Sequence, residues 1–392
     1  MLPCTLVFYD DAPTFGGHEL MVLRLVQHLA RQGKHRLTFI ASALNTELCR
    51  RLGEVVPPID LRLTPYSSGR GQWIRTYLSI RPLLQLRRLI EVVKPALLIV
   101  VQGGIALSSL GVLAGRLAGV RTVSYLPMTR DESLFAATPF RARLRQWAVR
   151  PFYSLPHCLV TISPRMAQYA ARRRPHGSVR VVENGIDLPQ LAAESRSAVR
   201  SALGLADGDP LLLMLGRIEF RQKRHDLAVQ ALAIARARGL RANLLVVGSG
   251  PDEQALCAQV LTLGLADVVH WRDWQADVMP FYAACDLLLL PSRYEGVPLV
   301  MLEAMYAGRK ILAADVDGMA DMLPPAWTFP SGDAHALADL LVAPAPSNDA
   351  DHLKRHHELI CSQYTVEAFG RRFLRVIDEE VELARVACRV AQ

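Results

Sequence analysis

The chain has 392 residues, of which 51% are hydrophobic and 21% are charged, and its formal net charge is +8. This composition is typical of a globular protein and excludes an intrinsically disordered one. The length exceeds that of one ordinary hydrophobic core, so we expect two domains.

Short apolar runs alternate with helical periodicity through the first half. A strand over Thr5–Tyr9 is followed by a helix over Leu20–Ala30 and a strand over Arg36–Ile40. Further strands are expected over Leu97–Val101, Arg121–Tyr125 and Cys158–Ile162, with helices between them. Such alternation predicts an α/β fold in which helices cover both faces of a parallel sheet.

The uncharged stretch from Pro95 to Gly115 is the one segment that resembles a membrane span. The sequence Gln102-Gly103-Gly104 breaks it into a strand, a turn and a helix over Ala106–Ala118. A transmembrane helix needs about 20 apolar residues in one piece, so we expect no span here.

A polar stretch, Leu188 to Pro210, interrupts the alternation, which then begins again. Strands are expected over Leu211–Leu215, Asn243–Val247, Val268–Trp271 and Leu287–Leu290, with helices between them. The pattern predicts two doubly wound domains with a boundary near residues 186–200. A last helical segment, Thr365 to Ala391, could pack on either domain.

The charge is divided unevenly between the two halves. Residues 1–190 hold 25 Lys and Arg against 11 Asp and Glu, a balance of +14, whereas residues 191–392 hold 20 against 26, a balance of −6. Around residues 140–150, Phe140, Leu144 and Trp147 share one helical face, and four arginines fall mainly elsewhere. This pattern fits a basic amphipathic helix on an anionic membrane and equally an ordinary half-buried helix. No nucleic-acid recognition module is present, so we expect no nucleic-acid partner.

Cysteine and histidine spacing indicates neither a disulfide framework nor a metal site. The seven cysteines are scattered without a C-x-x-C pair, and the eleven histidines show no metal-binding motif. We therefore expect reduced thiols, a cytoplasmic location and no metal.

The segment SRYEGVPLVMLEAMYAG carries the strongest functional signal. Glu295 lies in the loop after the apolar strand, and Glu303 lies about one turn into a helix opened by Pro298. Ligands of open α/β sheets bind at the carboxyl ends of strands, and a helix start favours an anion. A carboxylate beside such a helix end suits a ligand with a phosphate at one end and a polyol at the other, as in a nucleotide sugar.

Basic and glycine residues follow other strands. Gly216-Arg217 comes directly after Leu211–Leu215, and Lys223 follows six residues after Arg217. An arginine and a lysine together are suited to neutralise a diphosphate, although either alone would be taken for a solvated loop residue. Gly16-Gly17 precedes the first helix, where free backbone N–H groups could approach a phosphate.

In their order and spacing these segments resemble the retaining glycosyltransferases of family 4, which have the GT-B architecture. The matching segments are GRIEFRQK, VVGSGPDE, Tyr282–Asp286, the Glu295/Glu303 pair and Ala314–Gly318. The resemblance implies two facing Rossmann-like domains: residues 1–187 on the acceptor side and residues 188–364 binding the nucleotide sugar. It also implies that residues 365–392 form a helix that returns to the first domain.

The resemblance assigns roles to particular residues. Arg217 and Lys223 would hold the diphosphate, Glu295 would contact the transferred sugar, and Glu303 would bind the ribose. Arg217, Lys223 and Glu295 are thus the expected catalytic residues. The wider donor site would comprise Gly16, Gly17, Trp271, Arg272, Gly296, Val297, Leu299 and Val300. Many relatives carry a histidine after the strand that here ends at Tyr125; the acceptor-side candidates are His18, Tyr125 and Met128.

The implied activity is metal-independent transfer of a hexose from a nucleotide-diphosphate sugar to a glycan or lipid-linked acceptor. A uridine diphosphate sugar is the expected co-substrate, with guanosine diphosphate mannose next, and no other cofactor is expected. The expected setting is lipopolysaccharide or polysaccharide biosynthesis at the inner face of the cell membrane. Alternatives are a nucleotide-sugar epimerase and a non-catalytic nucleotide-sugar-binding subunit.

Overall fold

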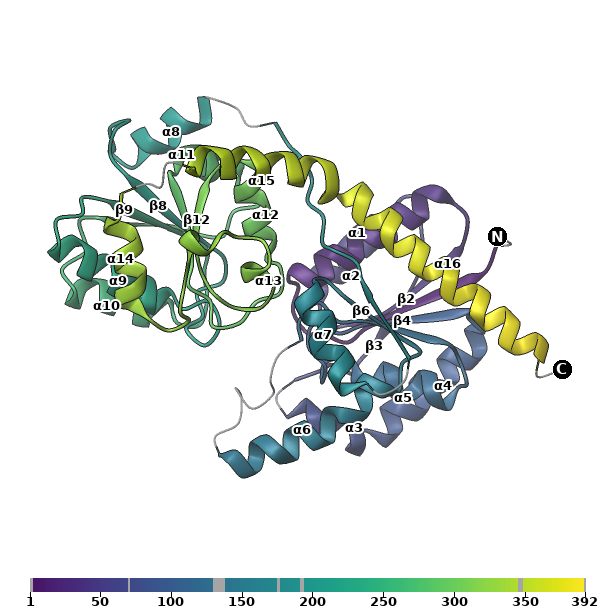
Figure 1. Cartoon of the computed structure of the whole chain (residues 1–392). Helices are drawn as coiled ribbons and strands as arrows, with labels where there is room; N and C mark the ends of the chain where they lie inside the picture. Colours follow the sequence, from purple (N-terminus) through teal and green to yellow (C-terminus); the bar gives the residue numbers. More distant parts are fainter. Residues whose placement is uncertain are drawn as a thin grey trace. The chain divides into compact units, whose positions relative to one another are not determined.

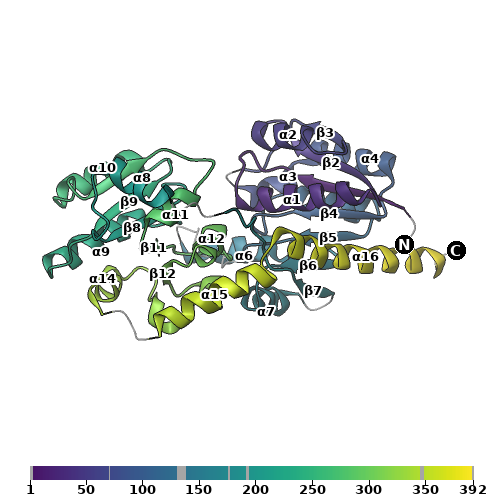
Figure 2. The same ribbon diagram turned by 90° about the horizontal axis from the view of Figure 1, so that it is seen from above.

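The computed structural model describes residues 3–69, 71–129, 138–174, 177–190, 194–344 and 348–390. These residues form two compact units. Unit 1 comprises Met1–Asn184 and Val366–Gln392, and unit 2 comprises Gly185–Thr365. Both units are α/β, with one sheet each (Figures 1 and 2).

Unit 1 is built on a seven-stranded parallel sheet in the order β3-β2-β1-β4-β5-β6-β7. Its strands are β1 (Thr5–Asp10), β2 (Arg36–Ser42), β3 (Asp60–Thr64), β4 (Leu97–Val101), β5 (Thr122–Tyr125), β6 (Cys158–Thr161) and β7 (Ser178–Val181). Its helices are α1 (Gly17–Gln32), α2 (Thr46–Gly53), α3 (Gln72–Leu78), α4 (Ile80–Val93), α5 (Ser109–Leu117), α6 (Pro139–Ser154), α7 (Pro164–Arg173) and α16 (Val366–Val390).

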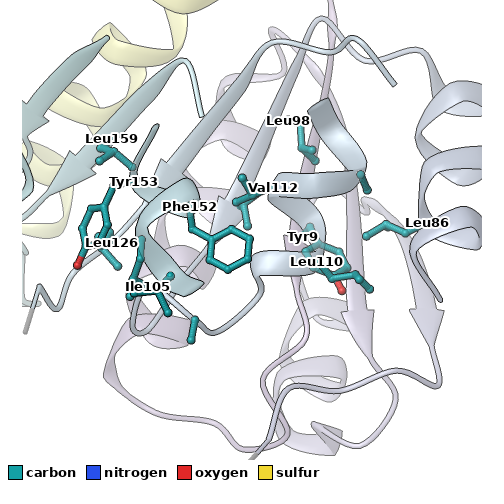
Figure 3. Close-up of a cluster of buried hydrophobic side chains, with 14 of the residues drawn as sticks. Tyr9, Leu86, Leu98, Ile105, Leu110, Val112, Leu126, Phe152, Tyr153 and Leu159 are labelled. Atoms are coloured by element: carbon teal, nitrogen blue, oxygen red, sulfur yellow. The ribbon is translucent and has the colours of Figure 1, made fainter. Parts of the chain in front are cut away.

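Alternate residues of each strand point to opposite faces of this sheet, and both faces are covered. Val7 and Tyr9 of β1 join a core formed with residues of α4, α5, α6 and α7 (Figure 3). Phe8, between them, stacks on Phe39 of β2 with ring centroids 5.9 Å apart. The buried strands are therefore apolar without alternation, as parallel strands with two covered faces usually are.

Helix α16 packs in unit 1, although it follows unit 2 in sequence. Phe373 packs edge-on against Tyr125, with ring centroids 5.6 Å apart. Glu380, which is buried, accepts a hydrogen bond from the Arg121 guanidinium at 2.7 Å. The apolar stripe of the last helix is thus buried against the first sheet.

Unit 2 has a six-stranded parallel sheet in the order β10-β9-β8-β11-β12-β13. Its strands are β8 (Leu211–Leu215), β9 (Asn243–Val247), β10 (Val269–Arg272), β11 (Leu287–Leu290), β12 (Lys310–Ala314) and β13 (Thr328–Phe329). Its α-helices are α8 (Glu194–Ala202), α9 (His225–Ala237), α10 (Glu253–Thr262), α11 (Met279–Ala284), α12 (Leu299–Tyr306), α13 (Asp317–Ala320), α14 (Ala334–Val342) and α15 (Asp349–Gln363). A short 3₁₀ helix covers Pro325–Trp327.

The prediction that Leu188 to Pro210 merely interrupts the alternation was wrong, because α8 lies within it. This helix is anchored by a polar side chain: Arg200 is buried and donates hydrogen bonds to the carbonyls of Ala206 and Ala284. A search for apolar periodicity does not detect such an anchor.

The interpretation of Pro95 to Gly115 as a strand, turn and helix agrees with β4 and α5. Among the residues that the structure describes, no helix is both long enough and apolar enough to cross a membrane.

Candidate active site

The strongest sequence motifs of unit 2 follow its two central strands. The strand order reverses between β8 and β11, which are hydrogen-bonded neighbours. Gly216-Arg217 follows the carboxyl end of β8, and the loop with Glu295 follows that of β11. Ligands of open α/β sheets bind outside the carboxyl ends of strands at such a reversal, so the fold places these two loops at the expected ligand site.

Lys223 and Glu295 form the central contact of this site. The Lys223 Nζ lies 2.6 Å from the Glu295 Oε1, and the Ser292 hydroxyl donates to the same oxygen at 3.0 Å. The Glu295 side chain is only 6% exposed. Both hydrogen bonds end on Oε1, so Oε2 is the oxygen to which a sugar hydroxyl could donate. The ammonium group has three donors and can bind an anion while it holds Glu295.

Arg217 lies at the more exposed side of the same loop. Its side chain is 60% exposed and forms an ion pair with Glu219 at 2.7 Å. The Lys223 side chain extends over Gly216, since a β-carbon added to that glycine would lie 3.9 Å from the Lys223 Cε. A backbone hydrogen bond from Arg293 to the Gln222 carbonyl joins the loop after β8 to the loop after β11. The structure therefore brings the loops of Arg217, Lys223 and Glu295 together.

The loop that carries Glu295 is held from behind by the segment Ala314–Gly318. Asp317 Oδ2 accepts a hydrogen bond from the Glu295 backbone N–H at 3.0 Å. Gly318 lies so close to this loop that an added β-carbon would be 2.7 Å from the Gly296 carbonyl oxygen. The sequence motif contained both residues, but nothing in the pattern indicated that they position Glu295.

A third loop, which follows β9, supports the loop that carries Arg217 and Lys223. Gly248, after β9, has a φ of +141°, and a β-carbon there would lie 2.1 Å from the Gly216 carbonyl oxygen. Asp252 Oδ2 accepts a hydrogen bond from the Phe220 N–H at 2.7 Å. The motif VVGSGPDE therefore fixes the shape of the loop that bears Arg217 and Lys223.

Helix α12 begins at Leu299, with Pro298 as its N-cap residue in extended conformation. The prediction that Pro298 occupies the first helical position was therefore off by one residue. The Pro298 side chain does not cap this end, and the N–H groups of Leu299 and Val300 lie in the first turn of the helix, where helices commonly bind anions. The loop residues Gly296 and Val297, just before this helix start, are buried.

Glu303 lies one turn further into the helix. Its Oε2 accepts a hydrogen bond from the Tyr282 hydroxyl at 2.9 Å. Burial and the nearby Glu303 carboxylate raise the pKa of Tyr282, so the phenol remains protonated and acts as a donor. This contact orients the carboxylate that we expected to bind ribose.

Trp271 and Arg272 end β10, the edge strand of the sheet, two strands away from β8. The Arg272 guanidinium donates to the Trp271 carbonyl at 2.8 Å. Of the donor-site residues predicted in unit 2, these two are thus the ones not placed at the central reversal.

In unit 1, Gly16 is the N-cap of α1 and Gly17 is its first residue. Glu19 reaches back and accepts a hydrogen bond from the Gly16 N–H at 2.8 Å. Apart from its two chain neighbours, no described residue has an atom within 4 Å of where the Gly17 β-carbon would be. The amide of Gly16 is therefore already engaged, whereas the surroundings of Gly17 are open.

A largely buried cluster of titratable side chains, Asp10, His18 and Glu19, lies beside this turn. His18 Nε2 is 2.8 Å from Glu19 Oε1, and a ligand atom of Asp10 lies within 4.8 Å of both side chains. Burial, and next the Glu19 charge, raise the pKa of Asp10 to about 8. Burial lowers the pKa of His18, but the Glu19 carboxylate outweighs it, so the net shift is upward.

This cluster is the one group of three potential ligands that the described residues offer to a metal ion. The expectation that the protein needs no metal stays a prediction.

The acceptor-side candidates differ in accessibility. His18 keeps a partly exposed side chain, and Met128 is half-buried. Tyr125 is fully buried, its hydroxyl donates to Asn184 Oδ1 at 3.1 Å, and its ring packs on α16. The structure therefore corrects the expectation for Tyr125, which belongs to the core and presents no free group to an acceptor.

Comparison with known proteins agrees with this architecture. A family model described as Glycosyltransferase Family 4 matches residues 15–190, and one described as Glycosyl transferases group 1 matches residues 209–343. A D-inositol 3-phosphate glycosyltransferase of Nocardia farcinica is 35% identical over 45% of this chain and 41% of its own length. The lipopolysaccharide core biosynthesis glycosyltransferase LpsE of Rhizobium meliloti is 24% identical over 56% of this chain and 64% of its own. The matches thus span less than two thirds of these relatives.

Solved structures resemble the whole chain at low sequence identity. Anabaena Alr3699/HepE in complex with UDP-glucose has a TM-score of 0.76 and 18% identity, and the match covers 96% of this chain and 100% of that one. The lipopolysaccharide outer core galactosyltransferase WaaB has a TM-score of 0.66 and 17% identity, and the match covers 96% and 99%. The two family models and the two Rossmann-like sheets lead to one conclusion: the chain belongs to the family 4 glycosyltransferases and has the GT-B fold.

Proposed function

We propose that this protein is a retaining glycosyltransferase that moves a hexose from a nucleotide-diphosphate sugar to a glycan or lipid-linked acceptor. The observation that carries the proposal is the contact between Lys223 and Glu295 at the strand-order reversal of unit 2. This contact supports the proposal because a cation suited to a phosphate lies beside a carboxylate suited to a sugar.

The donor is proposed to be a uridine diphosphate sugar. Support comes from the structural neighbour HepE, whose complexes contain UDP and UDP-glucose. Within this chain, Arg217 and Lys223 would bind the diphosphate and Glu303 would accept hydrogen bonds from the ribose. Gly17 would add a backbone N–H to the phosphates.

The chemistry is stabilisation of the leaving group. The bond between the sugar C1 and the phosphate oxygen breaks, C1 bonds to the acceptor hydroxyl oxygen, and the hydroxyl proton leaves with the diphosphate. In the transition state, negative charge grows on the diphosphate and positive charge grows on the sugar ring. Arg217, Lys223 and the N–H groups at the start of α12 stabilise the negative charge on the diphosphate. Glu295 stabilises part of the positive charge on the sugar ring. Because these groups are held in place before the reaction, little reorganisation is needed during it.

The reaction is proposed to be independent of a divalent metal, since two cationic side chains already serve the diphosphate. The acceptor is proposed to belong to lipopolysaccharide or other cell-surface polysaccharide biosynthesis. Relatives named for lipopolysaccharide synthesis support this setting. A lipid-linked acceptor would bring the protein to the inner face of the cell membrane.

A donor screen tests the proposal. Purified protein is incubated with a panel of nucleotide sugars with and without EDTA, and release of the nucleoside diphosphate is measured. We expect hydrolysis of a uridine diphosphate sugar that EDTA leaves unchanged, and a released sugar of the donor's anomeric configuration by NMR. Interconversion of the donor sugar without release would instead indicate an epimerase, and binding without any turnover would indicate a silent subunit.

A further inference from the structure

Helix α6 has two apolar faces, and only one of them is buried. Phe152 and Tyr153 point into the core of unit 1 (Figure 3), and Val149 belongs to the same core. On the opposite side, Phe140 is 75% exposed, Trp147 is 74% exposed, and Leu144 is exposed between them. Their spacing of four and three residues places them in one stripe. A helix that only covers a sheet needs a single apolar face, so the outer stripe is unexplained by the fold.

Helices α3 and α6 pack together in unit 1 (Figure 1). The outer stripe borders a groove between them. The groove has a volume of about 630 Å³. The large apolar side chains that line it are Trp73, Ile74 and Tyr77 from α3 and Leu144 and Trp147 from α6. We call this surface, together with Phe140, the α3–α6 groove.

The groove has a fixed wall. The Tyr77 hydroxyl donates to the Ala148 carbonyl at 2.6 Å, and its ring stacks on Phe152 with centroids 5.7 Å apart. These contacts hold α3 against α6, so the groove between the two helices has a defined shape.

Within α6 and α3, the charged residues beside the exposed stripe are all basic. Helix α6 contains Arg141, Arg143, Arg145 and Arg150 and neither Asp nor Glu. Arg141, Arg143 and Arg150 are exposed, and helical spacing places Arg143 and Arg150 on one side of Trp147 and Arg141 on the other. Helix α3 adds Arg75 and no acidic residue.

We propose that the α3–α6 groove docks onto an anionic lipid bilayer and takes up the hydrocarbon chain of a lipid. Exposed aromatic and aliphatic side chains between arginines are suited to the boundary between acyl chains and phosphate headgroups. A second copy of the chain fits less well, because two such surfaces would bring like charges face to face. The benefit to the protein rests on the proposed function, since a lipid-linked acceptor is met at such a surface, but the binding itself does not require the transfer reaction.

Vesicle flotation tests the charge component. The full chain is mixed with phosphatidylcholine vesicles and with vesicles that also contain phosphatidylglycerol. We expect binding to the second kind only, weakened by salt. An arginine near an anionic surface typically contributes about fivefold to partitioning, so the triple variant Arg141→Gln/Arg143→Gln/Arg150→Gln should lose on the order of a hundredfold. Arg241→Gln, an exposed arginine of unit 2, is the matched control and should bind like the wild type.

Acyl-chain contact is tested by fluorescence with vesicles whose lipids carry brominated chains. Tryptophan emission should be quenched in the wild type, and Trp147→Phe should lose much of this quenching while it still floats with the vesicles. Leu144→Glu should weaken flotation by at least roughly tenfold, because it puts a charge at a position that the bilayer would bury. Leu261→Glu, at an exposed leucine of helix α10, is the control and should have no effect.

Three results would overturn the proposal: flotation that does not depend on phosphatidylglycerol, quenching that is unchanged in Trp147→Phe, or vesicle binding that survives Leu144→Glu. Concentration-dependent dimerisation that Leu144→Glu abolishes, without vesicle binding, would assign the groove to a second copy. Binding of UDP is measured in the same variants. If UDP binds normally while flotation is lost, the lipid surface is separable from the donor site. If UDP binds to none of the proteins, the proposed uridine diphosphate donor is wrong and the flotation result still stands.

Discussion

Asp317 Oδ2 accepts a hydrogen bond from the backbone N–H of Glu295 at 3.0 Å. Asp317 has a φ of +43°, in the left-handed region that most side chains avoid and that Asn and Asp tolerate better. Its neighbour Gly318 lets the two backbones approach closely. The acidic residue that we expect to contact the sugar is therefore positioned by a second acidic residue 22 positions later in the chain.

Replacing Asp317 should separate positioning from binding. We expect Asp317→Ala to lower kcat by roughly tenfold, because the Glu295 loop loses a charge-assisted hydrogen bond. Asp317→Asn should retain most of the activity, since its amide oxygen can accept the same bond and Asn tolerates the same backbone conformation. Steady-state kinetics with the active donor provides the measurement. Equal losses of kcat in the two variants would show that activity depends on the carboxylate charge and not on the hydrogen bond to Glu295.

Removal of either diphosphate cation should impair catalysis strongly. Loss of one preorganised group of this kind typically costs about 3–4 kcal/mol, so Arg217→Ala and Lys223→Ala should each lower turnover by at least roughly a hundredfold. Lys223→Ala also leaves the buried Glu295 without its ammonium partner. Thermal unfolding should be recorded in parallel, and Arg241→Ala serves as an exposed control in the same unit. Near-wild-type turnover in both site variants would remove the diphosphate assignment.

Much of this site could be predicted from the sequence because its loops directly follow apolar strands. Once β8 and β11 are recognised as parallel neighbours, Arg217 and Glu295 must emerge at the same edge of the sheet. The length of a strand and its bounding residues are local properties, so Leu211–Leu215 was predicted with the observed bounds.

Contacts between distant segments could not be predicted in this way. Nothing local shows that Asp317 bonds to the Glu295 amide, or that Asp252 bonds to Phe220. For Tyr125, the local pattern led to a wrong expectation of accessibility. Its place at the end of β5 suggested an accessible group, but α16, more than 200 residues later, covers its ring. A side chain at the end of a strand is available only if no remote element packs on it.

The backbone conformation of Lys94 is expected to lower the free energy of unfolding. It ends α4 with a φ of +50°, and its N–H bonds to the Ile90 carbonyl, which is the helix end where glycine is preferred. Lys94→Gly should therefore raise the free energy of unfolding by about 0.5–1 kcal/mol. Lys94→Ala removes the same side chain but keeps the β-carbon, so it should give no gain. Urea unfolding of both variants tests this, and identical midpoints would mean that the left-handed conformation carries no measurable strain.

The buried cluster of Asp10, His18 and Glu19 should make stability depend on pH. Burial and the Glu19 charge raise the pKa of Asp10 from 3.8 to about 8 in the folded protein. Between these two values the folded state binds more protons than the unfolded state, so stability should fall as the pH rises from about 4 to about 8. The raised pKa of His18 acts in the same direction, because the stability it contributes below 6.5 is lost as the pH rises through its folded pKa.

Asp10→Asn isolates the effect of Asp10. Asparagine does not titrate, so the stability of this variant relative to the wild type should increase as the pH rises and should level off above about 8. Urea unfolding from pH 5 to pH 9 provides the measurement, and Asp207→Asn, at an exposed position of unit 2, is the control variant. If the relative stability of Asp10→Asn stays constant over this range, Asp10 is ionised throughout it, and water or a bound cation must stabilise its charge beside Glu19.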